Sequence, residues 1–211
     1  MNTPNFVVTI GRQMGSGGRE LGQLLAQRLG VEFYDKRLLM DAAKKSGLLP
    51  EFFEQNDERT PNRLTGGLGL GMSFFGGTTL SGCTIDDTVY RAQSEAIREL
   101  GETKSCVIVG RTADYILRNH PHCISIFVHA PEDVCIKRLL CRGDKDCEND
   151  ARAMCRKANK IRSSYYNFYT DRQWGMASTY DLSIDSSLLP MEQLADLLAD
   201  YVRARISNYS K

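Results

Sequence analysis

Glycines gather in one short stretch near the start of the chain, GRQMGSGGREL at residues 11–21. Glycine accepts positive φ angles and lets a ligand approach the backbone closely, and successive N–H groups of such a loop can point together at an anion. A helix that begins directly after the loop adds the positive end of its dipole. The stretch therefore predicts a phosphate-binding loop made of Arg12, Gly15, Ser16, Gly17, Gly18 and Arg19.

The triphosphate-binding pattern G-x-x-x-x-G-K-[ST] fits this loop incompletely. Aligned on Gly17, it places Arg12 where its first glycine belongs. Gly18 and Arg19 then stand where lysine and a hydroxyl residue are expected. The lysine normally neutralises phosphate charge and the hydroxyl normally helps to hold magnesium. We expect Arg19 or Arg12 to supply the missing charge, with a solvated residue in the first helical turn as the alternative for Arg19.

Two other interpretations of the loop stay open. The dinucleotide pattern G-x-G-x-x-G fits Gly15 and Gly17, and Asp35 lies about where its ribose-binding carboxylate is expected. Glu20, however, occupies the third glycine position of that pattern. The other interpretation is a glycine-rich turn that binds no ligand.

A second group of residues with chemical potential is basic. Residues 137–162 contain nine Lys or Arg against four Asp or Glu. Phosphoryl transfer depends on positioning and on positive groups around the transferred phosphate, and arginine binds phosphate oxygens in a bidentate manner. The polar run CRGDKDCEND at 141–150 interrupts the helical pattern, which predicts a hinged lid over residues 141–162. Its basic members are Arg142, Arg152, Arg156 and Lys160, and a pair of solvated charged helices is the alternative.

Short apolar strands alternate with helices along the chain. We expect strands at 6–10, 31–35, 106–110, 123–130 and 180–185, with helices at 19–29, 36–45, 85–100, after 131, and at 191–206. This alternation is typical of an α/β fold whose parallel sheet is covered on both faces. Ligands bind such sheets at the carboxyl ends of the strands, where the glycine loop, Asp35 and Arg111 are predicted to lie.

Length and composition limit the class of protein. The chain has 211 residues, 42% hydrophobic and 25% charged, and we expect one domain over 1–211 with an insertion or flap at 47–84. A net charge of +1 argues against a dedicated nucleic-acid surface. No apolar run approaches the roughly 20 residues of a membrane helix, and residues at the N-terminus do not show the basic stretch followed by an apolar core that is typical of a secretion signal. The seven cysteines form no C-x-x-C pair. We therefore expect reduced thiols in a cytoplasmic protein without nucleic-acid or membrane partners.

Several segments together resemble the cytidylate kinase-like family of bacterial proteins, a divergent branch of the P-loop nucleoside monophosphate kinases. They are GRQMGSGGRELGQLLAQRLGVEFYDKRLL, VGRTADYIL, HAPEDVCIKRLL, RSSYYNFYTDRQWG and YDLSIDSS. The resemblance covers nearly the whole chain except roughly residues 47–84. It implies a three-layer P-loop NTPase fold with a five-stranded parallel sheet, a helical lid and an acceptor-side insertion. It also implies ATP with Mg²⁺ as phosphoryl donor, and a nucleoside monophosphate, CMP or dCMP, as acceptor.

The resemblance also suggests roles for particular residues. Arg138 matches the lid arginine after the fourth strand, and Arg162 falls near the arginines that return from the lid. Together with Arg19 they are the expected catalytic residues. Asp35 and Arg111 match positions that bind the acceptor in the relatives.

The chain departs from the family pattern at important positions. Cytidylate kinases keep the loop lysine, here Gly18, and carry an aspartate where this chain has Val109. A degenerate P-loop module that binds nucleotide for regulation without turnover is therefore the alternative to an active kinase. A dinucleotide-dependent oxidoreductase is a third hypothesis.

Other features receive structural interpretations. Asp114 is expected to cap a helix, with a displaced metal carboxylate as the alternative. The aromatic residues at 165–174 are expected to pack the lid helix onto the core, with base stacking as the alternative. No spacing of histidine and cysteine predicts a metal site. The Gly-rich loop 66–77 predicts a mobile flap or a contact in a homo-oligomer.

Overall fold

The computed structural model describes residues 5–39 and 85–209. The chain forms two compact units, Met1–Lys36 with Ile97–Lys211, and Arg37–Ala96. The sheet and the candidate site belong entirely to the first unit. The expected insertion at 47–84 and the loop at 66–77, with its flap or subunit contact, lie outside the described residues.

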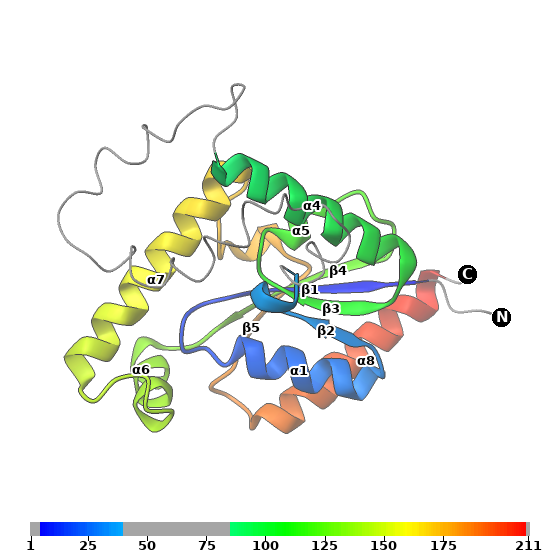
Figure 1. Ribbon diagram of the computed structural model, residues 1–211. Helices are drawn as coiled ribbons and strands as arrows, with labels where there is room; N and C mark the ends of the chain where they lie inside the picture. The colour runs from blue at the N-terminus through cyan, green and yellow to red at the C-terminus, as the bar shows by residue number, and fades with distance from the viewer. Residues whose placement is uncertain (1–4, 40–84, 210–211) are drawn as a thin grey trace. The chain divides into compact units, whose positions relative to one another are not determined.

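Five parallel strands form one sheet in the order β2-β3-β1-β4-β5 (Figure 1). The strands are β1 (Val7–Arg12), β2 (Glu32–Tyr34), β3 (Cys106–Val109), β4 (Cys123–His129) and β5 (Leu182–Asp185). The predicted five-stranded parallel α/β sheet is thus confirmed. Central β1 pairs with β3 on one side and β4 on the other, so the loops that follow β1 and β3 leave the same edge of the sheet side by side.

Helices cover both faces of this sheet. The helices α1 (Gly18–Leu29) and α8 (Met191–Tyr209) pack together on one face, and the short α5 (Ala113–Ile116) lies on the other (Figure 1). Leu21 and Leu25 of α1 and Leu198 of α8 are fully buried against the strands. The alternation of apolar and polar residues at helical spacing in α1 and α8 produces this core. Helix α4 (Ile85–Thr103) precedes β3, and a single 3₁₀ turn, η2 (Ala177–Thr179), precedes β5.

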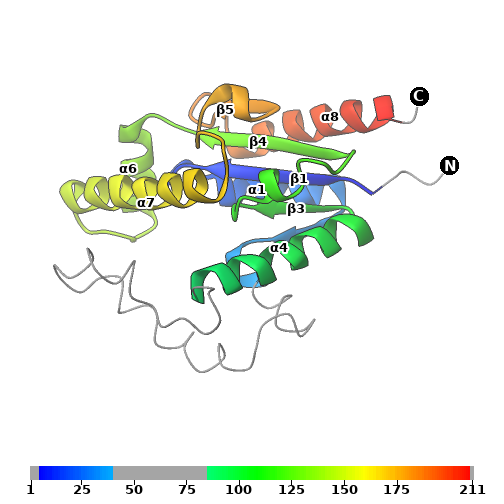
Figure 2. The same cartoon turned by 90° about the horizontal axis from the view of Figure 1, so that it is seen from above.

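Two further helices extend beyond the carboxyl ends of β1 and β4 (Figure 2). They are α6 (Glu132–Cys141) and α7 (Glu148–Tyr169), and they pack on each other through buried Ile136, Leu139 and Cys155. The chain between them, 142–147, is the central part of the polar run predicted at 141–150; Cys141 still belongs to α6, and α7 already begins at Glu148. Helix α7 continues for 22 residues and carries the predicted lid region onto the core.

Helix boundaries follow local backbone preferences. Helix α1 begins at Gly18, one residue earlier than the sequence predicts, after an N-cap at Gly17 with φ 76°. It ends at Leu29, and the C-cap Gly30, with φ 67°, closes the last turn by donating its N–H to carbonyls of that turn. Within residues 5–39 and 85–209, no helix has the length and apolar character needed to cross a membrane.

Gly22 sets how closely α1 approaches the sheet. A Cβ at this position would lie 2.9 Å from a Val109 methyl and 3.1 Å from Ile10 Cδ1. Replacing an exposed helical glycine with alanine stabilises a helix by about 1 kcal/mol. Overpacking a tight core contact destabilises by about 1–3 kcal/mol.

We therefore expect Gly22→Ala to lower the free energy of unfolding by about 1 kcal/mol, because the steric cost exceeds the gain in propensity. Urea unfolding would measure the change. Gln27→Ala, at an exposed position of the same helix, should change stability by less than about 0.5 kcal/mol. A more stable Gly22→Ala protein would contradict this account of the packing.

Candidate functional site

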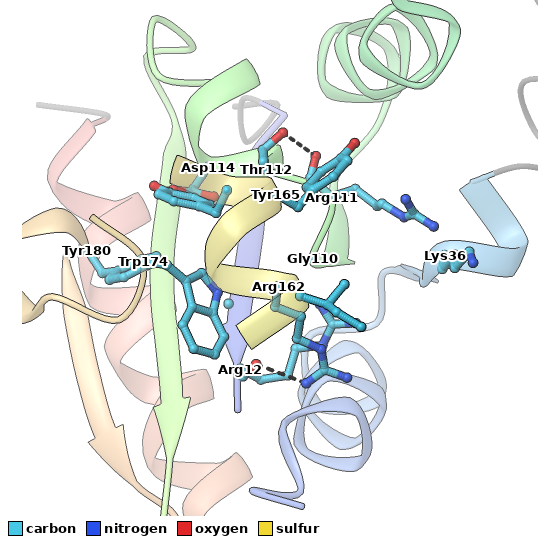
Figure 3. A pocket seen from close by; sticks show the side chains of 13 residues that line it. Arg12, Lys36, Gly110, Arg111, Thr112, Asp114, Arg162, Tyr165, Trp174 and Tyr180 are labelled. Carbon is cyan, nitrogen blue, oxygen red and sulfur yellow. Dashed lines mark hydrogen bonds between the residues drawn. The ribbon is translucent and has the colours of Figure 1, made fainter. Parts of the chain in front are cut away.

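A pocket of about 320 Å³ opens at the carboxyl ends of the central strands (Figure 3). Its size is typical of a small-ligand site. Residues from β1, the loop after β3, helix α7 and the segment before β5 line it. They include Gly11, Arg12, Lys36, Gly110, Arg111, Thr112, Asp114, Ile161, Arg162, Tyr165, Tyr166, Trp174 and Tyr180.

Three arginines converge on this pocket from different elements. Arg12 comes from the end of β1, Arg111 follows β3, and Arg162 comes from α7 (Figure 3). Burial lowers the pKa of Arg12 to about 9, helped by the positive charges of Arg162 and Arg111 and opposed by Asp35. Burial also lowers the pKa of Arg162. Like charges held together away from water favour an anion in the space between them.

Arg111 is presented by a strained turn. Gly110, Arg111 and Thr112 have φ angles of 83°, 61° and 54°, so three consecutive residues take the left-handed conformation. Glycine adopts it freely, but arginine and threonine each lose about 1–2 kcal/mol in this region. Strain of this kind accumulates at functional sites. The turn directs the Arg111 side chain into the pocket instead of letting β3 continue directly into a helix.

An aromatic wall faces the arginines. The rings of Phe127 and Trp174 meet edge to face with centroids 5.2 Å apart, and Phe127 lies 4.9 Å from Tyr180. Gly11 permits this packing, since a Cβ there would lie 2.8 Å from the Phe127 ring. Trp174, Tyr180 and Tyr165 line the pocket itself. A cationic end and an aromatic wall suit a ligand that carries both a phosphate and a planar ring.

Asp114 is a buried carboxylate between these two sides. The hydroxyl of Tyr166 donates a hydrogen bond of 2.6 Å to its Oδ2 atom. Burial raises the pKa of Asp114, although this hydrogen bond acts in the opposite direction. Thr112 is the N-cap residue of α5, so Asp114 lies in the first turn of α5, where a carboxylate is favourable, but it is not the cap.

The glycine loop has the backbone geometry that the sequence predicts. Gly15 and Gly17 have φ angles of 79° and 76°. Gly15 packs against α6, where a Cβ would lie 2.7 Å from the Cys135 carbonyl oxygen. No side chain caps the N-terminus of α1 at Gly17, which leaves amides of the first turn without a capping acceptor. This arrangement can bind the oxygens of a phosphate.

Arg138 is fixed to the loop. Its Nη1 atom donates to the Ser16 carbonyl and to the Ser186 hydroxyl, both at 2.9 Å, and Nη2 donates to the Ser186 carbonyl at 2.8 Å. The Ser186 hydroxyl also donates to the Ser16 carbonyl at 2.6 Å. These contacts hold the Arg138 guanidinium against the Ser16 carbonyl in this conformation.

One stripe of α7 holds the other side of the loop. Asn159 Oδ1 accepts from the Met14 amide at 2.7 Å, and Arg162 Nη1 donates to the Arg12 carbonyl at 3.2 Å. Cys155 Sγ contacts the Met14 carbonyl and Tyr166 bonds Asp114, so residues 155, 159, 162 and 166 form one helical face. Sequence reasoning missed Asn159 and Ser186. The spacing of four, three and four residues was the available signal.

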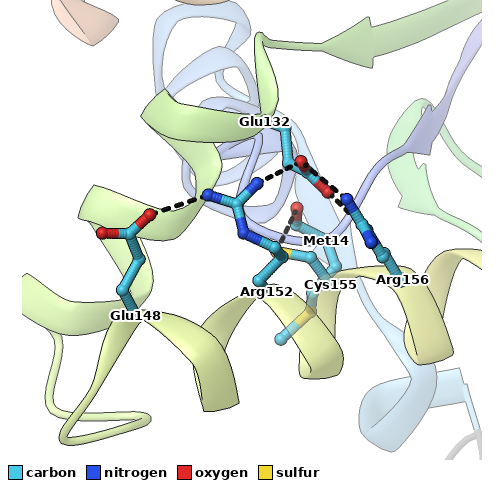
Figure 4. Close-up of polar contacts among 6 residues, drawn as sticks. All are labelled: Met14, Glu132, Glu148, Arg152, Cys155 and Arg156. Atoms are coloured by element: carbon cyan, nitrogen blue, oxygen red, sulfur yellow. Dashed lines mark hydrogen bonds and ion pairs between the residues drawn. The ribbon is translucent and has the colours of Figure 1, made fainter.

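The other basic residues of the lid region lie on a different face. Arg152 and Arg156 both pair with Glu132, and Arg152 also pairs with Glu148 (Figure 4). Glu132 has a lowered pKa because of these contacts, with the Arg156 hydrogen bond first among them. Arg142 pairs with Asp144, and Lys160 is exposed. The structure does not bring these four residues to the pocket lined by Arg12, Arg111 and Arg162.

Arg19 and Asp35 form an ion pair beside the loop. The Arg19 guanidinium lies 2.9 Å from Asp35 Oδ2, and its side chain is 62% exposed, against 13% for Asp35. Thus Arg19 contacts Asp35, which is predicted to bind the acceptor substrate, and the Arg19 side chain is mainly solvated. Arg12 and Arg162, in contrast, line the pocket. Among residues 5–39 and 85–209, no group of His, Cys, Asp and Glu has the geometry of a metal site.

Comparison with known proteins identifies the family. The sequence profile of the cytidylate kinase-like family matches residues 7–188, and the chain therefore belongs to this family. Among solved structures, a protein described as uncharacterized from Eubacterium ventriosum ATCC 27560 is 27% identical with a TM-score of 0.68, covering 94% of this chain and 99% of that one. A comparison with curated protein sequences finds no match.

More distant solved structures share the fold. A gluconokinase from Sinorhizobium meliloti 1021 has a TM-score of 0.53 at 15% identity, covering 100% of this chain and 98% of that one. A shikimate kinase from Acinetobacter baumannii in complex with shikimate has a TM-score of 0.51 at 17% identity, covering 96% and 94%. These similarities support the P-loop kinase fold that the sequence predicts.

The strain at Arg111 can be separated from its charge. Arg111→Ala and Arg111→Gly both remove the guanidinium, but only glycine relieves the left-handed backbone. We expect Arg111→Gly to be more stable than Arg111→Ala by about 1 kcal/mol in urea unfolding. Equal stability of the two variants would show that the turn carries no strain.

The buried carboxylate of Asp114 should make stability depend on pH. Its pKa is raised on folding, so the native protein loses stability as the pH rises from the unfolded-state pKa, about 4, through the raised folded value. Asn in its place can still accept from Tyr166. We therefore expect Asp114→Asn to be more stable than the parent at pH 7, with the difference shrinking toward pH 4. Urea unfolding across this pH range would measure it, and a difference independent of pH would contradict the burial argument.

Proposed function

We propose that the protein transfers a phosphoryl group from ATP, with Mg²⁺, to a nucleoside monophosphate, CMP or dCMP. The observation that carries the proposal is the convergence of Arg12, Arg111 and Arg162 opposite an aromatic wall at the carboxyl ends of β1 and β3. Membership of the cytidylate kinase-like family supports the same reaction class.

The pocket suits a monophosphate acceptor. A phosphate monoester is largely dianionic at neutral pH because its second pKa is about 6. Its oxygen can attack without a general base, so the acceptor side needs cations and orientation more than a proton acceptor. Arg111 and Arg162 bind this phosphate in the proposal, while Trp174 and Tyr180 contact the base.

The glycine loop suits the donor. Positive φ angles at Gly15 and Gly17 and the uncapped start of α1 present backbone N–H groups to the triphosphate. Magnesium ions in kinases are bound by one or two carboxylates together with substrate phosphates. Asp35, the carboxylate at the end of β2 and paired to Arg19, would contribute to holding the ion. When bound, the metal neutralises charge on the donor phosphates.

The chemical step forms a bond between an acceptor phosphate oxygen and the γ-phosphorus of ATP. The bond from that phosphorus to the bridging oxygen of ADP breaks. Arg162 stabilises the charge that develops on the transferred group, and Arg138 keeps the loop in shape through Ser16. In the proposal, the lid region excludes water when it closes, and Arg152 and Arg156 exchange Glu132 for phosphate oxygens.

A regulatory nucleotide-binding module is the second candidate function. The observation that favours it is Gly18, which leaves the loop without its lysine. Such a module would bind ATP at the glycine loop and change conformation, without phosphorylating an acceptor.

The experiment is a turnover panel with the parent protein. ATP and Mg²⁺ are combined with CMP, dCMP, UMP, AMP or GMP, and with shikimate or gluconate as hydroxyl acceptors. We expect ADP to form in equimolar amount with CDP or dCDP. A coupled assay would measure the ADP, and chromatography would identify the second product. Thermal stabilisation by ATP without phosphorylation of any acceptor would favour the regulatory module instead. Stabilisation by NAD but not by ATP would favour an oxidoreductase.

Arg162 provides the matched variant test. Arg162→Ala should lower single-turnover rates by about two to three decades, with a smaller effect on ATP affinity, because the group acts on transition-state charge. Lys157→Ala removes an exposed cation from the same helix and should leave both quantities unchanged. If Arg162→Ala matched Lys157→Ala, Arg162 would have no part in the reaction.

A further inference from the structure

Two departures from the triphosphate pattern touch each other in the structure. Arg12 stands in place of the first glycine and Gly18 in place of the lysine. A Cβ built on Gly18 would lie 2.6 Å from Arg12 Cβ, 3.2 Å from Arg12 Cγ and 3.2 Å from Val128 Cβ. Real Cβ atoms do not approach a neighbour's Cβ to 2.6 Å. A lysine at position 18 and an arginine at position 12 therefore exclude each other in this conformation of the loop.

The Arg12 side chain runs from the loop into the pocket. Its stem lies against Gly18, and its guanidinium lies against Gly110, where a Cβ would be only 1.9 Å from Nη1. Gly110 is thus a second glycine that Arg12 requires. The guanidinium lies near Arg162 (Figure 3), and the positive charges of Arg162 and Arg111 both lower its pKa. One side chain therefore connects the donor loop with the arginine cluster.

The Arg12 guanidinium also lacks a hydrogen-bond acceptor within the described part of the protein. Across residues 5–39 and 85–209, no protein atom accepts a hydrogen bond from it, although it offers five N–H donors. Asp35 acts on it electrostatically and accepts a hydrogen bond from Arg19 Nε at Oδ2. A desolvated cation without a hydrogen-bonded counter-charge is costly, so an anionic ligand is the expected partner.

We propose that Arg12 and Gly18 are a compensating exchange of residue types between two positions of the loop. Arg12 supplies, from the end of β1, the positive charge that a lysine at position 18 supplies in other P-loops. Gly18 leaves space for the aliphatic part of the Arg12 side chain, and Gly110 leaves space for its guanidinium. This inference rests on the proposed function, since it names the group that contacts the phosphate passed from ATP to the acceptor.

The exchange changes what the cation can do. Lysine is a single point charge on a flexible stem, whereas the planar guanidinium donates hydrogen bonds in two directions. Arg12 can therefore contact the γ-phosphate of ATP and the acceptor phosphate at the same time. It forms no covalent bond and transfers no proton. Its role is to hold two negative groups together and to stabilise the charge between them as one bond forms and the other breaks.

The test is a double-mutant cycle of Arg12→Gly, Gly18→Lys and the two combined, which rebuilds the usual loop pattern. Arg12→Gly should weaken ATP binding at least tenfold and lower single-turnover rates by about two to three decades. Gly18→Lys should be destabilised in urea unfolding without ligand, because lysine meets the Arg12 stem. The combined variant should recover at least tenfold in ATP affinity over Arg12→Gly and regain the stability that Gly18→Lys loses.

The readouts distinguish the possible failures. ATP affinity comes from calorimetry, stability from urea unfolding of the ligand-free protein, and rates from single turnover. If Arg12→Gly equals the parent, or if the combined variant is no better than its weaker single variant, the exchange is refuted while the parent's activity stands. A parent that binds no ATP would refute the proposed function and this role of Arg12 together. Lys157→Ala serves again as the control for loss of a surface cation.

Discussion

Burial of arginine side chains at one pocket is the constraint on which the rest of the site depends. Burial is the largest cause of the lowered pKa of Arg12 and of Arg162, and the positive charges of Arg162 and Arg111 lower the pKa of Arg12 further. The lowered pKa values of Arg12 and Arg162 record the loss of water around these groups. A folded chain keeps such groups together only if the surrounding backbone and packing hold them, or if an anion joins them.

The backbone around the cluster provides this rigidity. The left-handed turn at 110–112 stores strain behind Arg111, and the Arg12 stem is confined between Gly18 and Gly110. Arg162 donates to the Arg12 carbonyl, which ties α7 to the end of β1. Each cation is thus fixed by a different element. The unfavourable interactions at the pocket are offset by the apolar core of the sheet with α1 and α8.

Sequence reasoning predicted the sheet well because strands and helices alternate with clear periods. Apolar runs such as residues 106–109 are buried on both faces, and the structure places each near its expected position. It also predicted the carboxyl ends of β1, β2 and β3 as the place of the chemical residues. These predictions depend on local residue patterns, which are visible in a single sequence. The direction of the Arg12 side chain depends on two glycines 6 and 98 residues away, so no local pattern could contain it.

Helix α7 illustrates why the spacing of charges does not show which helix face contacts the glycine loop in this conformation. The basic residues Arg152, Arg156 and Lys160 recur every four residues, and this spacing made them the natural lid contacts. The structure uses the neighbouring face at 155, 159, 162 and 166, where only one residue is charged. An exposed row of arginines is satisfied by nearby carboxylates such as Glu132. A helix face that contacts a buried loop needs individual side chains that each form a hydrogen bond with a particular backbone atom of the loop. Asn159 at the Met14 amide meets that requirement, and it does so without adding another positive charge beside a pocket lined by Arg12, Lys36, Arg111 and Arg162.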